Sequence, residues 1–389
     1  MTSRLEIPQA RSEDPVALRL KGLIVKELGR QGFRIEDGIL KARDLSTKES
    51  SRSLHRPSVD HKREAGRPRL RTKEAALLKR IASGSEICPA KIRPRLVIVA
   101  RRSFEELLFR YASLHWSIPV SSGYGRRLRF LVIDEQNDKL IGIIGLGDPV
   151  FALKARDNWI GWSNADRELR LRYVADAFVL GAVPPYSYLL CGKLVALLAA
   201  SDEIREAFCE KYGQRESLIR HAAHDGRIAL ITTTSALGRS SIYNRLRFKE
   251  RKAFESVGFT EGSGEFHFCN GLYESIREFA DNFCVPTAKK PAWGSGFRSR
   301  REVVKKALVA LGLSTDWLYH GVRREIFVAP LAQNAREFLR GETEEPVWSA
   351  ASCGDLYDFF RERWLFPRAA WDLRYRTFDP SEWRLWPVT

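Results

Sequence analysis

The loop that follows the apolar run 228–234 is rich in groups that could bind an anion. It reads TTTSALGRSSIYNRLRF (232–248), so hydroxyl groups, backbone N–H groups and arginines come directly after a β-branched strand. Ligands often lie at strand-to-loop transitions in α/β folds, and a guanidinium can hold a phosphate through two parallel hydrogen bonds. The alternative is a polar capped turn, and the GxxxxGK[ST] sequence of a phosphate loop is missing. The predicted anion-binding residues are Thr233, Thr234, Ser235, Gly238, Arg239, Ser240, Ser241, Asn244 and Arg245, with Tyr243 as a candidate for proton transfer.

A second group of polar residues lies in the segment DPVFALKARDNWIGWSNAD (148–166). Its carboxylates and guanidinium could serve a metal ion, a general base or a phosphate. The alternative is a set of salt-bridged carboxylates beside two packed tryptophans, which residue chemistry alone favours. The candidates are Asp157 for proton transfer and Arg156, Trp159 and Trp162 for binding.

His267 is a third catalytic candidate, because it stands in a strand-like aromatic context. The segment FESVGFTEGSGEFHF (254–268) predicts two short strands joined by a turn at 262–264. The alternative is a histidine packed in the core. The six cysteines have no CxxC or CxH spacing, so we expect reduced thiols and predict neither a metal site nor a disulfide framework. No cofactor can be assigned from these motifs.

The elements that must position these residues alternate between strands and helices. Apolar and β-branched runs predict strands at 130–133, 140–146, 173–180 and 228–234. Helical spacing predicts helices at 16–33, 100–115 (capped by Ser103 and completed by Glu106), 193–212, 301–312 and 331–342. This order predicts an α/β (α+β) fold with a mixed central sheet.

Composition divides the chain into three predicted segments: a basic helical arm and linker (1–95), a central α/β domain (96–285) and an Arg/Trp-rich, mainly helical C-terminal region (286–389). Residues 41–80 hold 13 Lys or Arg against 5 Asp or Glu, which is typical of either a disordered linker or a phosphate-binding arm. The tail interleaves arginines with Trp364, Trp371, Trp383 and Trp386. Such a tail either stacks on single strands or docks on a core.

The charge balance points to a polyanionic partner. Lys and Arg outnumber Asp and Glu by 65 to 48, for a formal net charge of +17. We expect nucleic acid, and DNA first, as this partner. No lipid-facing basic helix, apolar stretch or secretory signal is evident, so we expect a cytoplasmic protein without a membrane partner.

Several long segments resemble the DruA family of the Druantia anti-phage defence system. They are GLGDPVF, ARDNWIGWS, AFVLGAVPPYSYLLCGKLVA, TTTSALGRSSIYNRL, GFTEGSGEFHF and HGVRREIFVAPLAQNAREFLRGE, within about residues 128–342. This resemblance implies a bacterial defence role beside a large helicase-like partner, but no particular molecular activity.

The order of strands is also similar to the GCN5-related N-acetyltransferase fold. Phe254, Glu255, Gly258 and Phe259 fill its (Y/F)ExxGF signature, and 173–180 and 228–234 correspond to its fourth and fifth strands. The pyrophosphate loop of that fold is not legible at 185–193, so this resemblance implies a fold and no cofactor. Two functions remain open: an enzyme acting on nucleic acid or a nucleotide, or a non-enzymatic DNA-binding subunit that recruits a helicase-like effector.

Overall fold

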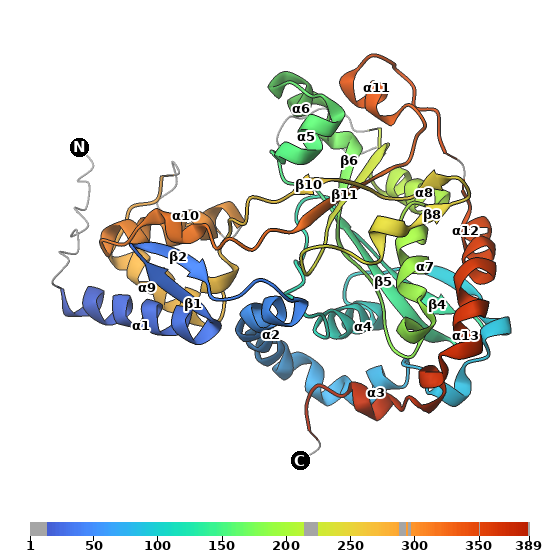
Figure 1. Cartoon of the computed structure of the whole chain (residues 1–389), viewed down its shortest axis with the longest axis horizontal. Helices are drawn as coiled ribbons and strands as arrows, with labels where there is room; N and C mark the ends of the chain where they lie inside the picture. The colour runs from blue at the N-terminus through green and yellow to red at the C-terminus, as the bar shows by residue number, and fades with distance from the viewer. Residues whose placement is uncertain (1–13, 214–224, 288–292, 295–296, 350, 388–389) are drawn as a thin grey trace.

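A seven-stranded mixed sheet forms the centre of the larger lobe in the computed structural model, which describes residues 14–213, 225–287, 293–294, 297–349 and 351–387 (Figure 1). The strands lie in the order β10-β11-β7-β6-β5-β4-β3. Their bounds are β3 (Pro94–Ile98), β4 (Leu128–Asp134), β5 (Lys139–Gly147), β6 (Val174–Ala182), β7 (Leu230–Thr234), β10 (Glu255–Phe259) and β11 (Glu325–Pro330). The predicted hairpin, the strands predicted at 173–180 and 228–234, and the mixed α/β class are confirmed.

Within this sheet, β6 and β7 are parallel neighbours, and the other neighbouring pairs are antiparallel. The parallel register is short and runs from Val174 opposite Leu230 to Asp176 opposite Thr232. These are the strands that the acetyltransferase resemblance equates with the fourth and fifth of that fold. The likeness to that fold stays a prediction.

The predicted helix 193–212 is two helices, α7 (Cys191–Leu198) and α8 (Asp202–Tyr212). Ser201 separates them and caps α8, because its hydroxyl accepts the N–H of Ile204 at 3.4 Å. Helix α7 packs on β5 and β6, and Leu194 and Leu198 are fully buried there. The sequence pattern therefore located the buried face of α7 correctly and missed the break.

Two further predictions of local structure need correction. Helix α4 (Phe104–Ser113) has the predicted cap at Ser103, but Glu106 accepts the N–H of Arg102 rather than completing the box on Ser103. Residues 266–268 form a 3-10 turn instead of a second strand, so β10 has no hairpin partner in that segment. The other helices of this lobe are α3 (Glu74–Leu78), α5 (Lys154–Ile160), α6 (Asn164–Arg170) and α11 (Ala335–Arg340).

A smaller lobe lies at the left of Figure 1. It consists of α1 (Pro15–Gln31), the hairpin β1 (Phe33–Glu36) and β2 (Ile39–Ala42), α9 (Leu272–Phe283) and α10 (Phe297–Ala310). One hydrophobic cluster joins Leu20 and Ile24 of α1 with Ile276 of α9 and Val304 of α10. This core draws on all three predicted segments, and the boundaries at 95 and 285 stay a prediction.

Helix α2 (Lys48–Leu70) lies between the two lobes and replaces the expected linker. Thr47 caps it by accepting the N–H of Ser50 at 3.0 Å, and Leu54, His55 and Val59 are buried. The disordered-linker alternative is therefore wrong. The sequence did not indicate this helix, because the segment contains two internal prolines and many charged residues. Its few apolar side chains nevertheless lie on the buried face of the helix.

The C-terminal region continues from α12 (Cys353–Phe360) through a π-helical turn (Arg361–Leu365) into α13 (Phe366–Trp371). Trp383 and Trp386 are buried against Tyr111 of α4, with ring centroids 5.6 and 6.3 Å from its ring. Trp371 is 69% exposed. The docking alternative therefore holds for the last two tryptophans and does not hold for Trp371.

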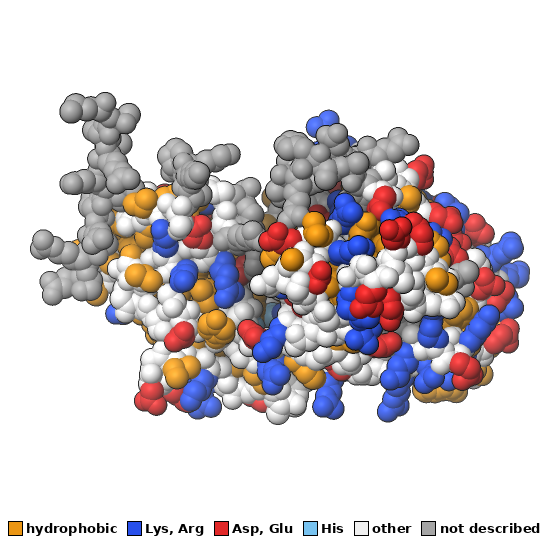
Figure 2. Space-filling model, turned by 90° about the horizontal axis from the view of Figure 1, so that it is seen from above, with side chains coloured by type: hydrophobic (Ala, Val, Ile, Leu, Met, Phe, Trp, Pro, Cys, Tyr) orange, Lys and Arg blue, Asp and Glu red, His pale blue; other side chains and the backbone are white. Residues whose placement is uncertain are grey.

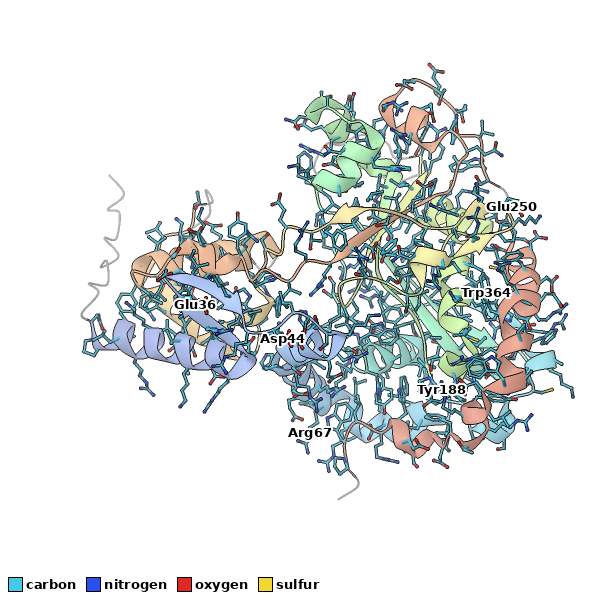
Figure 3. The ribbon with its side chains drawn as sticks, in the orientation of Figure 1. Glu36, Asp44, Arg67, Tyr188, Glu250 and Trp364 are labelled. Carbon is cyan, nitrogen blue, oxygen red and sulfur yellow. The ribbon has the colours of Figure 1, made fainter. Side chains whose placement is uncertain are left out.

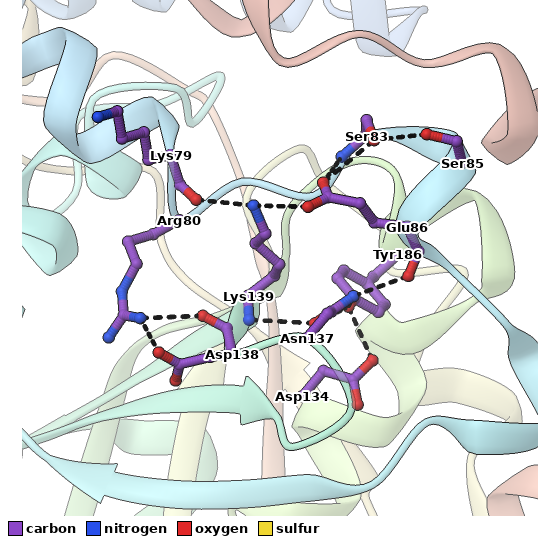
Figure 4. Close-up of polar contacts among 10 residues, drawn as sticks. All are labelled: Lys79, Arg80, Ser83, Ser85, Glu86, Asp134, Asn137, Asp138, Lys139 and Tyr186. Atoms are coloured by element: carbon purple, nitrogen blue, oxygen red, sulfur yellow. Dashed lines mark hydrogen bonds and ion pairs between the residues drawn. The ribbon is translucent and has the colours of Figure 1, made fainter.

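Polar contacts fix the tip of the β4–β5 hairpin to its surroundings (Figure 4). The buried carboxylate of Asp134 accepts the N–H of Arg93 at 3.0 Å and the hydroxyl of Tyr186 at 2.8 Å. Asn137 donates to the carbonyl of Glu86 at 3.0 Å. The Tyr186 bond ties the segment before α7 to the hairpin, and the other two bonds tie the segment 86–93 to it.

Candidate nucleic-acid interface

The loop after β7 is organised around a carboxylate of the chain itself, that of Glu325 at the start of β11. Glu325 is 5% exposed and accepts the N–H of Ser240 at 3.1 Å and the amide of Asn244 at 3.0 Å. Its other oxygen accepts the hydroxyl of Ser256 at 2.7 Å. The backbone N–H of Glu325 donates to Ser235 Oγ at 3.1 Å. The predicted anion-binding donors thus gather around an anion, and that anion is internal.

Two further hydroxyl groups of the loop, those of Thr233 and Ser240, bond to the backbone of the protein. Thr233 donates to the carbonyl of Ala177 at 2.9 Å, and Ser240 Oγ accepts the backbone N–H of Tyr243 at 3.1 Å. Tyr243 is buried, 4.9 Å from the ring of Phe254, and burial raises its pKa to about 12. Its side chain is therefore a core group. Thr234 and Gly238 are half-buried, and Ser241 is exposed.

The arginines of the same loop point outward and continue into the small hairpin β8 (Arg247–Phe248) and β9 (Arg251–Lys252). Residues 239–252 hold six basic side chains against one acidic side chain. In the described part of the chain, none of the six makes an ion pair, and all are exposed. We call them the loop cations; they are Arg239, Arg245, Arg247, Lys249, Arg251 and Lys252.

The basic residues of α2 differ from the loop cations because carboxylates of the same helix already pair with several of them. Arg52 pairs with Glu49 at 2.8 Å, and Arg67 pairs with Glu64 at 3.1 Å. Arg56 and Arg63 both lie 3.5 Å from Asp60. The phosphate-binding arm predicted at 41–80 therefore has less uncompensated charge than its composition indicates. Figure 2 likewise shows acidic and basic side chains interspersed on the face of the larger lobe seen from above.

The second predicted group, around Asp157, is a buried ion-pair network. Arg156 has no exposed surface, and its Nε donates to Asp157 at 2.7 Å. The other oxygen of Asp157 accepts from Arg167 at 3.0 Å and from the N–H of Leu153 at 3.0 Å. Arg156 also donates to two backbone carbonyls, those of residues 150 and 151, at 3.0 Å each. This geometry supports the salt-bridge alternative.

The two tryptophans beside this network contact α11. Trp162 donates its ring N–H to the carbonyl of Leu339, and the guanidinium of Arg156 lies 5.7 Å from its ring. The guanidinium of Arg336 lies 5.4 Å from the ring of Trp159. The structure therefore brings Asp157, Arg156, Trp159 and Trp162 together, but the contacts are those of a packed junction.

His267 lies far from both groups, in the core of the smaller lobe. It has no exposed surface, and its Nε2–H donates to the carbonyl of Trp317 at 2.8 Å. Burial lowers its pKa to about 4, and its ring centroid lies 5.5 Å from that of His320. A substrate cannot reach a fully covered ring, so this placement supports the core-histidine alternative. In the described residues, no cluster of His, Cys, Asp and Glu could hold a metal ion.

Sequence reasoning missed two acidic residues that matter to the sheet. One is Glu325. The other is Asp176, whose pKa burial raises to about 6, although Thr232 donates to it at 2.9 Å and Arg156 lies near enough to lower the value. A signal for Asp176 was present, because an aspartate stands alone inside the apolar strand YVADAFVL (173–180). Glu325 has no comparable signal.

Comparisons with known proteins agree with one another. Residues 45–341 match the family model described as Druantia protein DruA. A curated protein of Escherichia coli (strain UMEA 4076-1), described as Druantia protein DruA, is 40% identical over 366 residues, which cover 94% of this chain and 90% of that protein. No solved structure matches the chain.

None of the described helices combines the length and the apolar composition that a membrane crossing requires.

Proposed function

Because the chain belongs to the DruA family of the Druantia anti-phage defence system, we propose that it is a subunit of that system that binds the phosphate backbone of DNA through the loop cations. The observation that carries this proposal is the exposure of six basic side chains with no ion-pair partner among the described residues. Uncompensated surface cations bind phosphates by releasing counterions. We further propose that the subunit works in the cytoplasm beside a helicase-like component of the system.

A binding role is favoured over catalysis because the three predicted proton-transfer groups are committed elsewhere. Asp157 is held by two arginines, Tyr243 is buried among aromatic rings and His267 has no exposed surface. The loop cations need no such group to function. The hydrogen bonds from Ser240 and Asn244 to Glu325 hold the loop in place. Arg239 is exposed to solvent on this fixed loop.

Removing two loop cations should weaken DNA binding in a salt-dependent manner. The double variant Arg239→Ala/Lys252→Ala should make the log–log salt slope for a 20-base-pair duplex shallower by about 1.8, at roughly 0.9 per lost phosphate contact. Fluorescence anisotropy at several salt concentrations measures this slope.

Phage protection tests the same loop in cells. When wild type and variants are expressed in one bacterial strain, Arg239→Ala should abolish protection. Arg239→Lys should impair it, because lysine cannot form the bidentate contact.

A matched control removes two cations that already have carboxylate partners. Arg56→Ala/Arg67→Ala takes the same charge from α2 and should change the slope by less than half as much. Equal slopes for the wild type and the loop variant, or a larger effect of the α2 variant, would reject the loop as the DNA-binding surface.

Asp176 supports a second candidate function, an enzyme that modifies nucleic acid or a nucleotide. A carboxyl group with a pKa of about 6 can exchange a proton near neutral pH, and Asp176 lies where β6 and β7 end their parallel pairing. Asp176 is a fourth candidate for proton transfer under this hypothesis.

Asp176→Asn separates the two functions. Burial disfavours the charged carboxylate, so the uncharged amide should melt at or above the wild-type temperature at pH 8, where Asp176 is ionised. An enzyme would lose phage protection in this variant while duplex affinity is unchanged. A purely binding subunit would keep full protection.

A further inference from the structure

Two cations from distant parts of the sequence lie beside Trp364, and a third, Arg245, lies near enough to one of them, Lys193, to act on its charge. Lys193 belongs to α7, Arg245 ends the 3-10 turn Tyr243–Arg245, and Arg363 lies in the π-helical turn before α13. The ammonium of Lys193 lies 5.3 Å from the centroid of the Trp364 ring, and the guanidinium of Arg363 lies 5.4 Å from it. Burial lowers the pKa of Lys193, and the nearby charges of Arg245 and Arg363 lower it further.

Among the described residues, the Trp364 ring lies near two of these like charges, but no carboxylate pairs with any of the three. The acidic groups of the neighbouring α12 region are engaged elsewhere. Asp358 and Glu362 pair with Arg361, at 3.5 and 3.2 Å, and Asp355 accepts the hydroxyl of Ser352 at 2.6 Å. Grouping three cations costs free energy that a bound anion would recover.

A row of aromatic rings runs from the same point to the β8–β9 hairpin. The Phe359 ring lies 5.6 Å from Trp364 and 5.3 Å from Phe248, both times edge to face. The three rings are half-buried, so each keeps part of its surface in solvent. The ammonium of Lys249 lies 5.2 Å from the Phe248 ring. Figure 3 labels Trp364 beside α7 and the helical segment that follows α12, and labels Glu250 in the turn of the β8–β9 hairpin.

Cations that alternate with exposed aromatic surface suit a particular ligand chemistry. A phosphate can lie among the three cations while a base stacks on a ring, and stacking tolerates any base. The bases of a duplex are stacked inside the helix and cannot reach the rings, whereas the bases of an unpaired strand can. A duplex would therefore use the charges alone.

We propose that Lys193, Arg245, Arg363, Trp364, Phe359 and Phe248 form a platform that binds an unpaired segment of nucleic acid, with phosphates on the cations and bases on the rings. This proposal rests on the proposed nucleic-acid-binding function and adds the preferred form of the ligand. The platform would select unwound or single-stranded regions.

The test compares a fluorescent 12-nucleotide oligo(dT) with a 20-base-pair duplex, using the full chain. Trp364→Leu keeps an apolar side chain over the core and should weaken oligo(dT) binding roughly tenfold, because it removes a stacking surface. It should change duplex affinity less than twofold. Trp364→Phe keeps an aromatic ring, so its affinity for oligo(dT) should stay within about threefold of the wild-type affinity. Trp371→Leu is the matched control, since Trp371 is exposed outside the platform, and it should leave both affinities unchanged.

The charges are tested separately from the stacking. Lys193→Gln/Arg363→Gln should make the salt slope for oligo(dT) shallower by about 1.4, at roughly 0.7 per phosphate contact on a single strand, whereas Trp364→Leu should not change the slope.

The outcomes distinguish the two proposals. If the wild type binds neither probe, the proposed function fails. If it binds the duplex but Trp364→Leu affects both probes equally or neither, the platform is rejected and the binding function stands. Free thymidine monophosphate is tested as a competitor at the nucleotide concentration of the oligo(dT). If it competes equally well, the platform proposal is rejected, because the site then binds a small nucleotide.

Discussion

Replacing Leu198 by aspartate should unfold the larger lobe. Leu198 has no exposed surface and belongs to the main hydrophobic cluster, between α7 and the sheet. The substitution removes the buried side chain, at a cost of about 2–5 kcal/mol for truncation alone, and adds the desolvation of an unpaired polar group. A total of roughly 5 kcal/mol or more is comparable with the whole stability of many domains. We expect an insoluble protein or a melting temperature lower by roughly 10 °C or more.

Leu198→Met is the matched control for this prediction. It conserves volume and apolarity, and should therefore cost less than about 1.5 kcal/mol. Thermal melting followed by circular dichroism compares the variants. A soluble Leu198→Asp protein with a wild-type midpoint would mean that α7 does not cover the sheet as described.

The sequence predicted those elements whose pattern is local. The hairpin β4–β5 was recognisable because two β-branched runs flank a polar turn, and α7 because its leucines recur at helical spacing. The break between α7 and α8 was not recognisable, because a serine can also lie inside a helix. Only the structure shows that the Ser201 hydroxyl caps α8 by accepting the N–H of Ile204. Helix α2 was misjudged because Pro57, Pro68 and a high charge are typical of linkers. Its few apolar residues gain a partner only when the two lobes meet.

The sequence could not predict the contacts that the residues of the candidate site make. The sequence predicted that donors of the 232–245 loop bind an external anion, and this stays a prediction; in the structure Ser240 and Asn244 donate to Glu325, which is far along the chain. A pairing of this kind depends on β11 lying beside β7, which no local pattern encodes. The same holds for Lys193 and Trp364, which meet only because α12 packs on α7.

Replacing Asp157 by alanine should destabilise the protein strongly, because it leaves a buried guanidinium without its partner. Burial lowers the pKa of Arg156, and the Asp157 carboxylate offsets that effect. Breaking a buried pair from one side typically costs about 3–5 kcal/mol, whereas replacing both partners by apolar residues often costs little. We therefore expect Asp157→Ala to melt far below wild type and Arg156→Met/Asp157→Leu to recover much of the difference.

This pair of variants separates a structural from a catalytic role for Asp157. If the carboxylate only holds Arg156 and Arg167 in place, phage protection should follow melting temperature across the single and double variants. A catalytic carboxylate would behave differently, because the double variant would then be stable and unprotective. Asp157→Ala with an unchanged melting temperature would contradict the buried network itself. Duplex affinity, measured below the melting transition of each variant, should stay near the wild-type value throughout, since none of the loop cations pairs with a residue of this network.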